Sequence, residues 1–230
     1  MLLRADAALA TIDAAFRLAF DTPAGHGLNL WGTYSEVSDL RWGYLLSVCT
    51  PKAVTLQLAD LGSTAGHSYV LLDVWAAGSD ESESNGTPTA GSLQLIPAGG
   101  SFTVLQSPLP VNPGHSDSGT YQILAPVMKN GWCLLGEARK TVAASRRRFA
   151  TVAPIAAGGF SAALRAATAE SVAVWVLPPS NATAGSAGGG VSGVVEVSCP
   201  AGSCTGLDCD VQLLLECTTA KGCTCKHAAQ

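Results

Sequence analysis

The chain has 230 residues, enough for one large β-sandwich or for a sandwich with a smaller companion. It is 47% hydrophobic and only 13% charged, whereas an ordinary globular domain carries about 25% charged residues. Its formal net charge of −4 excludes nucleic acid as a partner, because nucleic-acid recognition normally begins with a basic face.

The segment 1–19 is rich in Ala and Leu, and its apolar residues Leu9, Ile12 and Phe16 are spaced by three and four. This spacing predicts a short amphipathic N-terminal helix. Two aspartates interrupt the apolar run that a cleavable signal peptide would need. No stretch reaches the ~20 apolar residues that cross a bilayer, so no membrane span is expected.

From Asn29 onward, short apolar runs alternate with Gly, Pro, Ser and Asp, which is typical of an antiparallel β-sandwich. The runs are LNLW, WGYLLSV, AVTLQL, SYVLLDVW, SLQLI, SFTVL, YQILAPV and WCLLG. In AVTLQL, the apolar residues Val54, Leu56 and Leu58 recur with the period of two that marks a half-buried strand. We therefore predict an all-β fold with a sandwich over 20–150.

Residues 178–190 have the composition of a Gly/Ser linker. After the linker come two strand-like runs, GVVEVSC and CDVQLLLEC, which are bracketed by cysteines. We expect residues 151–230 to form a second, small β subdomain with a cysteine-rich end.

Six of the eight cysteines lie within the last 32 residues, with the spacing C-x4-C-x4-C-x7-C-x5-C-x-C. This array lacks two well-formed CxxC pairs, so it favours disulfides over a zinc site. Each bridge would contribute roughly 2–4 kcal/mol, and the pairing stays open. The disulfide candidates are Cys199, Cys204, Cys209, Cys217, Cys223 and Cys225.

Clustered disulfides predict a secreted or lumenal protein. Because no signal peptide follows Met1, we expect a signal peptide and other domains upstream of it. Two N-glycosylation sequons, at Asn85 and Asn181, fit this compartment, although Pro88 weakens the first. Two further cysteines, Cys49 and Cys133, either pair with each other or are buried thiols, and the sequence leaves both alternatives open.

Five of the thirteen cationic residues lie close together, which raises the question of a polyanion site. They are Arg139, Lys140, Arg146, Arg147 and Arg148. A solvated edge or face is the favoured interpretation, since edge cations discourage sheet-to-sheet aggregation.

No self-sufficient catalytic motif is present. The four histidines lack ligand spacing such as HExxH, and there is no G-x-S-x-G elbow. The available carboxylates, Glu36, Asp39, Asp60, Asp73 and Glu137, cannot be paired without distances. We assign no catalytic residue, no metal site and no cofactor.

Tryptophans cluster around the first predicted strands, at Trp31, Trp42 and Trp75. Indole rings can stack on sugars, which makes carbohydrate a candidate partner. The favoured interpretation is that these rings fill the sandwich core.

Several segments within 16–150 resemble the region after the catalytic barrel in α-galactosidase and raffinose-synthase-like glycoside hydrolases. They are FDTPAGHGLNLWG, RWGYLLSV, ADLG with YVLLDVW, and YQILAPVMKNGWCLLGEARKTV. The resemblance implies a non-catalytic C-terminal accessory domain of an enzyme acting on galactosides, with an upstream catalytic barrel as its partner. The two catalytic aspartates of such an enzyme would lie upstream of Met1.

Two alternatives stay open. One is a free-standing extracellular carbohydrate-binding or adhesive module, and the other is a structural wall or matrix protein held together by its cysteines. The cysteine-rich tail lies outside the pattern of the family.

Overall fold

The fold is known from a computed structural model. It describes residues 14–17, 29–48, 54–64, 66–74, 88, 93–104, 119–138, 140, 142–156, 158–179, 193–202 and 210–227. Antiparallel strands dominate these residues, together with one 3-10 helix, η1 (Leu58–Leu61). The predicted all-β fold is confirmed.

The first half is built on a six-stranded sheet in the order β1-β2-β3-β8-β5-β6. The bounds are β1 Ala14–Arg17, β2 Asn29–Val37, β3 Leu40–Val48, β8 Gly119–Pro126, β5 Tyr69–Asp73 and β6 Leu93–Ile96. A two-stranded sheet of β4 (Val54–Gln57) and β7 (Ser101–Val104) packs against one face of it. The smaller of two apolar cores lies between them.

Strand β4 shows the expected alternation. Leu56 is fully buried, while its neighbours Thr55 and Gln57 are exposed. Leu58 is buried as predicted, but it begins η1 rather than extending the strand.

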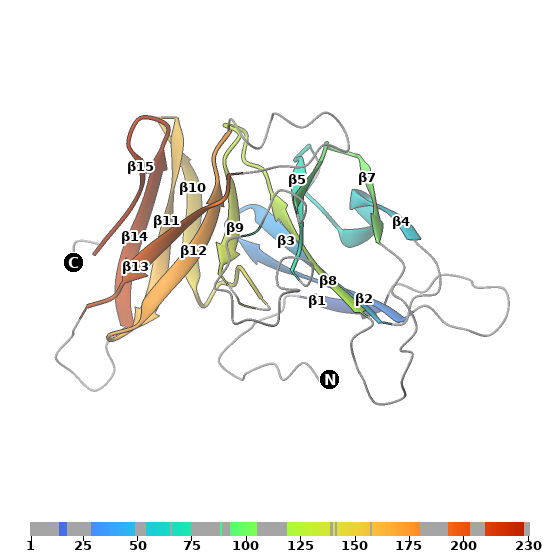
Figure 1. The fold of residues 1–230 in the computed structure, drawn as a ribbon, viewed down its shortest axis with the longest axis horizontal. Helices are drawn as coiled ribbons and strands as arrows, with labels where there is room; N and C mark the ends of the chain where they lie inside the picture. The colour runs from blue at the N-terminus through green and yellow to red at the C-terminus, as the bar shows by residue number, and fades with distance from the viewer. Residues whose placement is uncertain are drawn as a thin grey trace, which may run out of the picture.

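The second half contains a three-stranded and a four-stranded sheet, which stand beside the first half in Figure 1. The three-stranded sheet has the order β13-β12-β9, with β13 Val195–Pro200, β12 Ser171–Leu177 and β9 Cys133–Glu137. The other has the order β10-β11-β14-β15, with β10 Phe149–Ile155, β11 Gly159–Ala167, β14 Asp210–Thr218 and β15 Gly222–His227.

The larger apolar core joins the two halves. It includes Trp42 and Ile123 of the six-stranded sheet, Leu134 of β9, and Phe160 and Val174 of the second half. Strand β9 precedes the domain boundary expected at 150, yet it pairs with β12 beyond it.

One glycine permits the close approach at this junction. Gly136 in β9 has φ +117, and a Cβ there would lie 2.4 Å from the carbonyl oxygen of Ala143. Its absence lets the next residue, Glu137, donate its backbone N–H to that carbonyl at 2.6 Å. The loop 142–145 is thereby held against β9.

The predicted N-terminal helix is wrong where the chain is described, because Ala14–Arg17 form strand β1. This strand pairs antiparallel with β2 from Ala14↔Tyr34 to Arg17↔Trp31. Pairing with an available strand edge overrides the high helix propensity of Ala and Arg, because propensity is a weak determinant beside tertiary context. The rest of the segment, and both sequons, lie outside the described residues. Among the described residues, no helix is long and apolar enough to cross a membrane.

Candidate functional site

A buried tyrosine anchors the loop that joins the two halves. Tyr44 of β3 donates its hydroxyl to the carbonyl of Ala144 at 2.9 Å and accepts the N–H of the same residue at 3.1 Å. Ser35 of β2 also hydrogen-bonds to both Tyr44 and Ala144. Trp42 adds a bond from its indole N–H to the carbonyl of Leu134 at 2.9 Å. Strands β2 and β3 therefore fix the position of β9 and of the loop after it.

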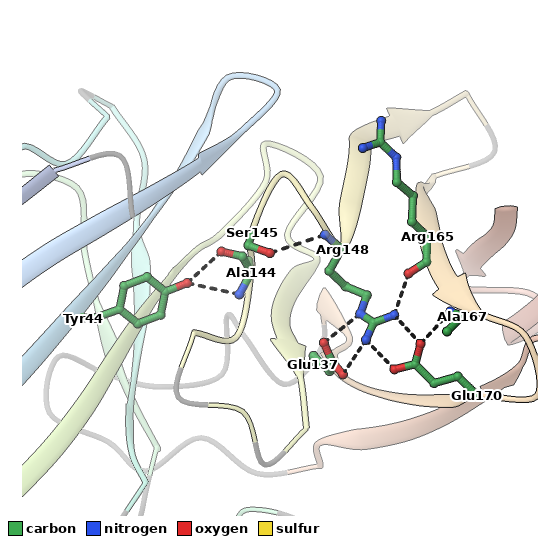
Figure 2. Close-up of polar contacts among 8 residues, drawn as sticks. All are labelled: Tyr44, Glu137, Ala144, Ser145, Arg148, Arg165, Ala167 and Glu170. Atoms are coloured by element: carbon green, nitrogen blue, oxygen red, sulfur yellow. Dashed lines mark hydrogen bonds and ion pairs between the residues drawn. The ribbon is translucent and has the colours of Figure 1, made fainter. Parts of the chain in front are cut away.

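Four residues beyond Ala144, the guanidinium of Arg148 lies between two carboxylates (Figure 2). Its Nε and Nη2 donate to the two oxygens of Glu137 at 2.9 and 3.2 Å. Its Nη1 and Nη2 donate to the oxygens of Glu170 at 2.9 and 2.5 Å, and Nη1 also donates to the carbonyl of Arg165. We call Arg148, Glu137 and Glu170 the arginine cluster.

The arginine cluster is largely shielded from water. The side chains of Arg148 and Glu137 are 18% and 8% exposed, and that of Glu170 is 31% exposed. The hydrogen bonds from Arg148 lower the pKa of Glu170, and the backbone N–H of Ala167 lowers it further. Both carboxylates thus accept hydrogen bonds from one cation, which ties β9 and the turn after β11 to the segment before β10.

The remaining cations of the basic run lie in the segment before β10. Lys140, Arg146 and Arg147 are exposed, in agreement with a solvated face, whereas Arg148 is largely buried. Arg146 donates its Nε to the backbone carbonyl of Glu36 at 2.9 Å. Arg139 lies outside the described residues.

Two disulfides fasten the C-terminal strands. Cys199 of β13 pairs with Cys225 of β15, and Cys217 pairs with Cys223 across the β14–β15 hairpin. The other two candidates, Cys204 and Cys209, lie outside the described residues. Disulfides of this kind belong to an oxidising environment.

The disulfide Cys199–Cys225 and two members of the arginine cluster lie at opposite edges of the two sheets of the second half, while the third member, Glu170, bonds through its carbonyl to Ala201 just after β13. Strands β13 and β15 are the last strands of their two sheets, and the disulfide Cys199–Cys225 joins them. At the other ends of the same sheets are β9, which carries Glu137, and β10, which begins directly after Arg148. A disulfide links the edge strands β13 and β15, and the ion pair of Arg148 with Glu137 links the edge strand β9 to the start of β10.

Trp42 is completely buried in the larger core, in agreement with the favoured interpretation that these rings fill a core and not with sugar stacking. Trp75 and the side chain of Trp31 lie outside the described residues. Trp132 and Trp175 are also buried, and their indole N–H groups are bonded to the carbonyl of Gly158 and to Glu196.

Two of the other carboxylates singled out from the sequence have structural partners. Asp60 accepts the backbone N–H of Gln57, and Glu36 pairs with Arg41. Cys133 is a buried free thiol whose pKa is raised by burial, and Cys49 lies outside the described residues. Within the described part of the chain, no three His, Cys, Asp or Glu side chains are grouped so as to hold a metal ion.

Sequence reasoning missed Glu170, the third member of the arginine cluster. It lies in the turn between β11 and β12, and no local motif marks it. No known family model, curated protein or solved structure matches this chain.

Proposed function

We propose that this chain is a non-catalytic C-terminal accessory β domain of a larger glycoside hydrolase of the α-galactosidase and raffinose-synthase-like type, which acts on galactosides. The proposal rests on the positions in the fold of the sequence segments that resemble this family. Where the structure describes them, they contribute to β2, β3, η1, β5, β8 and β9, and many of their side chains lie in the two cores. Such segments specify a scaffold.

The chemistry of the carboxylates supports a non-catalytic role. A glycosidase needs one carboxylic acid and one carboxylate that face the substrate. The two carboxylates of the arginine cluster instead face one guanidinium, from 2.5 to 3.2 Å away. In this proposal, hydrolysis belongs to the upstream barrel.

The test is the transcript sequence directly upstream of the codon for Met1. An open frame that continues into a barrel with two aspartates at its strand ends is the expected result. An in-frame stop codon would contradict the proposal. As a second test, the chain alone should not hydrolyse an α-galactoside such as p-nitrophenyl α-galactoside.

The second candidate is a free-standing extracellular β module. It is favoured by the disulfide Cys199–Cys225, which joins the outer strands of two sheets as expected for a domain exposed outside the cell. Both candidates place the protein in the secretory pathway, with N-glycosylation at Asn181 or Asn85. A decrease in mass after treatment with an N-glycosidase would support that placement, and an unchanged mass would count against it.

A further inference from the structure

Exposed cations surround the arginine cluster. Residues 139–148 contain five cations and no carboxylate. Arg148 lies largely buried between its two carboxylates, whereas Lys140, Arg146 and Arg147 are exposed. Lys140 lies close enough to the cluster to lower the pKa of Glu170. The basic run therefore supplies one internal counter-ion and leaves further positive charge on the surface around it.

A fourth exposed cation, Arg165, joins this surface from β11. Its backbone N–H donates to the carbonyl of Arg148 at 2.8 Å, and its exposed guanidinium points away from the two carboxylates of the cluster (Figure 2). Strand β11 is flanked by β10 and β14, so protection of a sheet edge does not explain a cation at this position. We call the four exposed residues Lys140, Arg146, Arg147 and Arg165 the basic patch.

The carboxylates beside the basic patch do not cancel its charge. Glu137 and Glu170 are bonded to Arg148, and Glu36 pairs with both Arg41 and Arg146. Asp39 borders the patch, because the preceding residue, Ser38, accepts the N–H of Val152 on β10. Together with Arg41 and Arg148, the region has six cations against the four carboxylates Glu36, Asp39, Glu137 and Glu170. Its charge is thus opposite in sign to the net charge of −4 of the whole chain.

The chemistry of the basic patch limits the partner. Three of its four cations are arginines, whose planar guanidinium groups bind two oxygens of one sulfate or carboxylate group at once. They lie on a turn and a strand and not in a closed pocket, which suits an extended polyanion better than a small anion. The two disulfides belong to an oxidising environment, and outside the cell the extended polyanions are chiefly sulfated polysaccharides.

We propose that the basic patch is a binding surface for a sulfated polysaccharide. This inference does not depend on the proposed role beside a barrel, because it rests on the exposed cations and their surroundings alone. It concerns a charged partner, unlike the stacking of neutral sugars on tryptophan that the sequence offered.

The first experiment titrates the full chain with a heparin octasaccharide by calorimetry, at neutral pH and about 50 mM NaCl, where screening is modest. We expect saturable binding, which Arg146→Gln/Arg165→Gln should weaken about threefold to tenfold, as expected for two exposed charges. The matched control is Lys129→Gln/Lys221→Gln, which removes two exposed cations near Gly159, at the other end of β11. This control should keep the affinity of the wild type.

A second variant tests for a gain of binding, which damage to the fold could not produce. Asp39→Asn removes a carboxylate that borders the basic patch, so it should tighten binding about twofold to fivefold. Unchanged or weaker binding by this variant would overturn the proposal.

Three further outcomes would also overturn it. They are the absence of saturable binding by the wild type, an equal loss of affinity in the two double variants, and equally tight binding of a DNA duplex of the same charge, which would show attraction to any polyanion. Each of these results leaves the upstream transcript test unaffected.

Discussion

At the scale of single residues, Arg148 holds the most consequential position, because one cation neutralises two shielded carboxylates. Arg148→Met keeps the length of the side chain but leaves Glu137 and Glu170 facing each other without a counter-charge. Removing one partner of a buried ion pair typically costs about 3–5 kcal/mol. We expect a loss of this size in the free energy of unfolding, measured by urea denaturation at neutral pH.

The control is Arg146→Met, two residues away. Arg146 also pairs with a glutamate, but its side chain is 60% exposed. An exposed ion pair contributes about 1 kcal/mol or less. The free energy of unfolding of Arg146→Met should therefore stay close to that of the wild type. If the two variants lost equal amounts of unfolding free energy, the burial of the arginine cluster would not be the reason that it stabilises the fold.

The same cluster predicts a pH dependence. Hydrogen bonds from Arg148 lower the pKa of Glu170 below its ordinary value of 4.5. A carboxyl whose pKa is lowered on folding contributes stability above that ordinary value and loses it as the pH falls through the folded value. The urea midpoint should therefore fall as the pH is lowered from above 4.5 through the folded pKa of Glu170, and Glu170→Gln should flatten this profile. A Glu170→Gln profile as steep as that of the wild type would assign the acid sensitivity to other groups.

Residue types alone could not have identified this cluster. Five cations lie close together in the sequence, and nothing local distinguishes Arg148 from Arg146. The partners of Arg148 lie 11 and 22 residues away, so the fold decides which cation becomes buried. Trp42 is similar, since an indole suits both a core and a sugar platform, and only its complete burial in the larger core shows which use applies.

At the scale of elements, the two disulfides should contribute unequally. The unfolded loop closed by Cys199–Cys225 spans 26 residues and that closed by Cys217–Cys223 spans 6, which correspond to about 3.5 and about 2 kcal/mol in the chain-entropy estimate. The double variant Cys199→Ala/Cys225→Ala should therefore lose more stability to urea than Cys217→Ala/Cys223→Ala. It should also aggregate more readily, because β13 and β15 lose their covalent link at the sheet edges. The reverse order would contradict the estimate.

Elements were predictable where the sequence alternates clearly. Leu56 between exposed Thr55 and Gln57 marks β4, and a mostly apolar run such as YQILAP marks β8 at the centre of a sheet. Strand β1 was not predictable, because its four residues have helical composition and become a strand only by pairing with β2. Short edge elements depend on their neighbours more than on their own residues.

At the scale of the whole molecule, the composition and the spacing of apolar runs predicted two parts, a sandwich over 20–150 and a small β subdomain over 151–230. The contacts between these parts became visible only in the structure. The larger core takes side chains from both, from Trp42 to Leu215. The loop that holds Ala144 is bonded to β3, and the next residues lead through Arg148 into the second half. No local pattern encodes such contacts, because they join residues about a hundred positions apart.

These contacts predict that both halves unfold in one cooperative transition, as small domains with a shared core do. In native-state hydrogen exchange with increasing denaturant, amides of β3 and β12 should lose protection at the same concentration, although they lie in different sheets. Tyr44→Phe is the diagnostic variant, because it removes the hydroxyl that bonds both backbone groups of Ala144. This variant should lower the denaturant concentration at which the amides of β3 and of β12 lose protection, and by the same amount for both strands. If β12 lost protection first while β3 stayed protected, the shared core would not couple the halves, and residues 20–150 would be an independent domain after all.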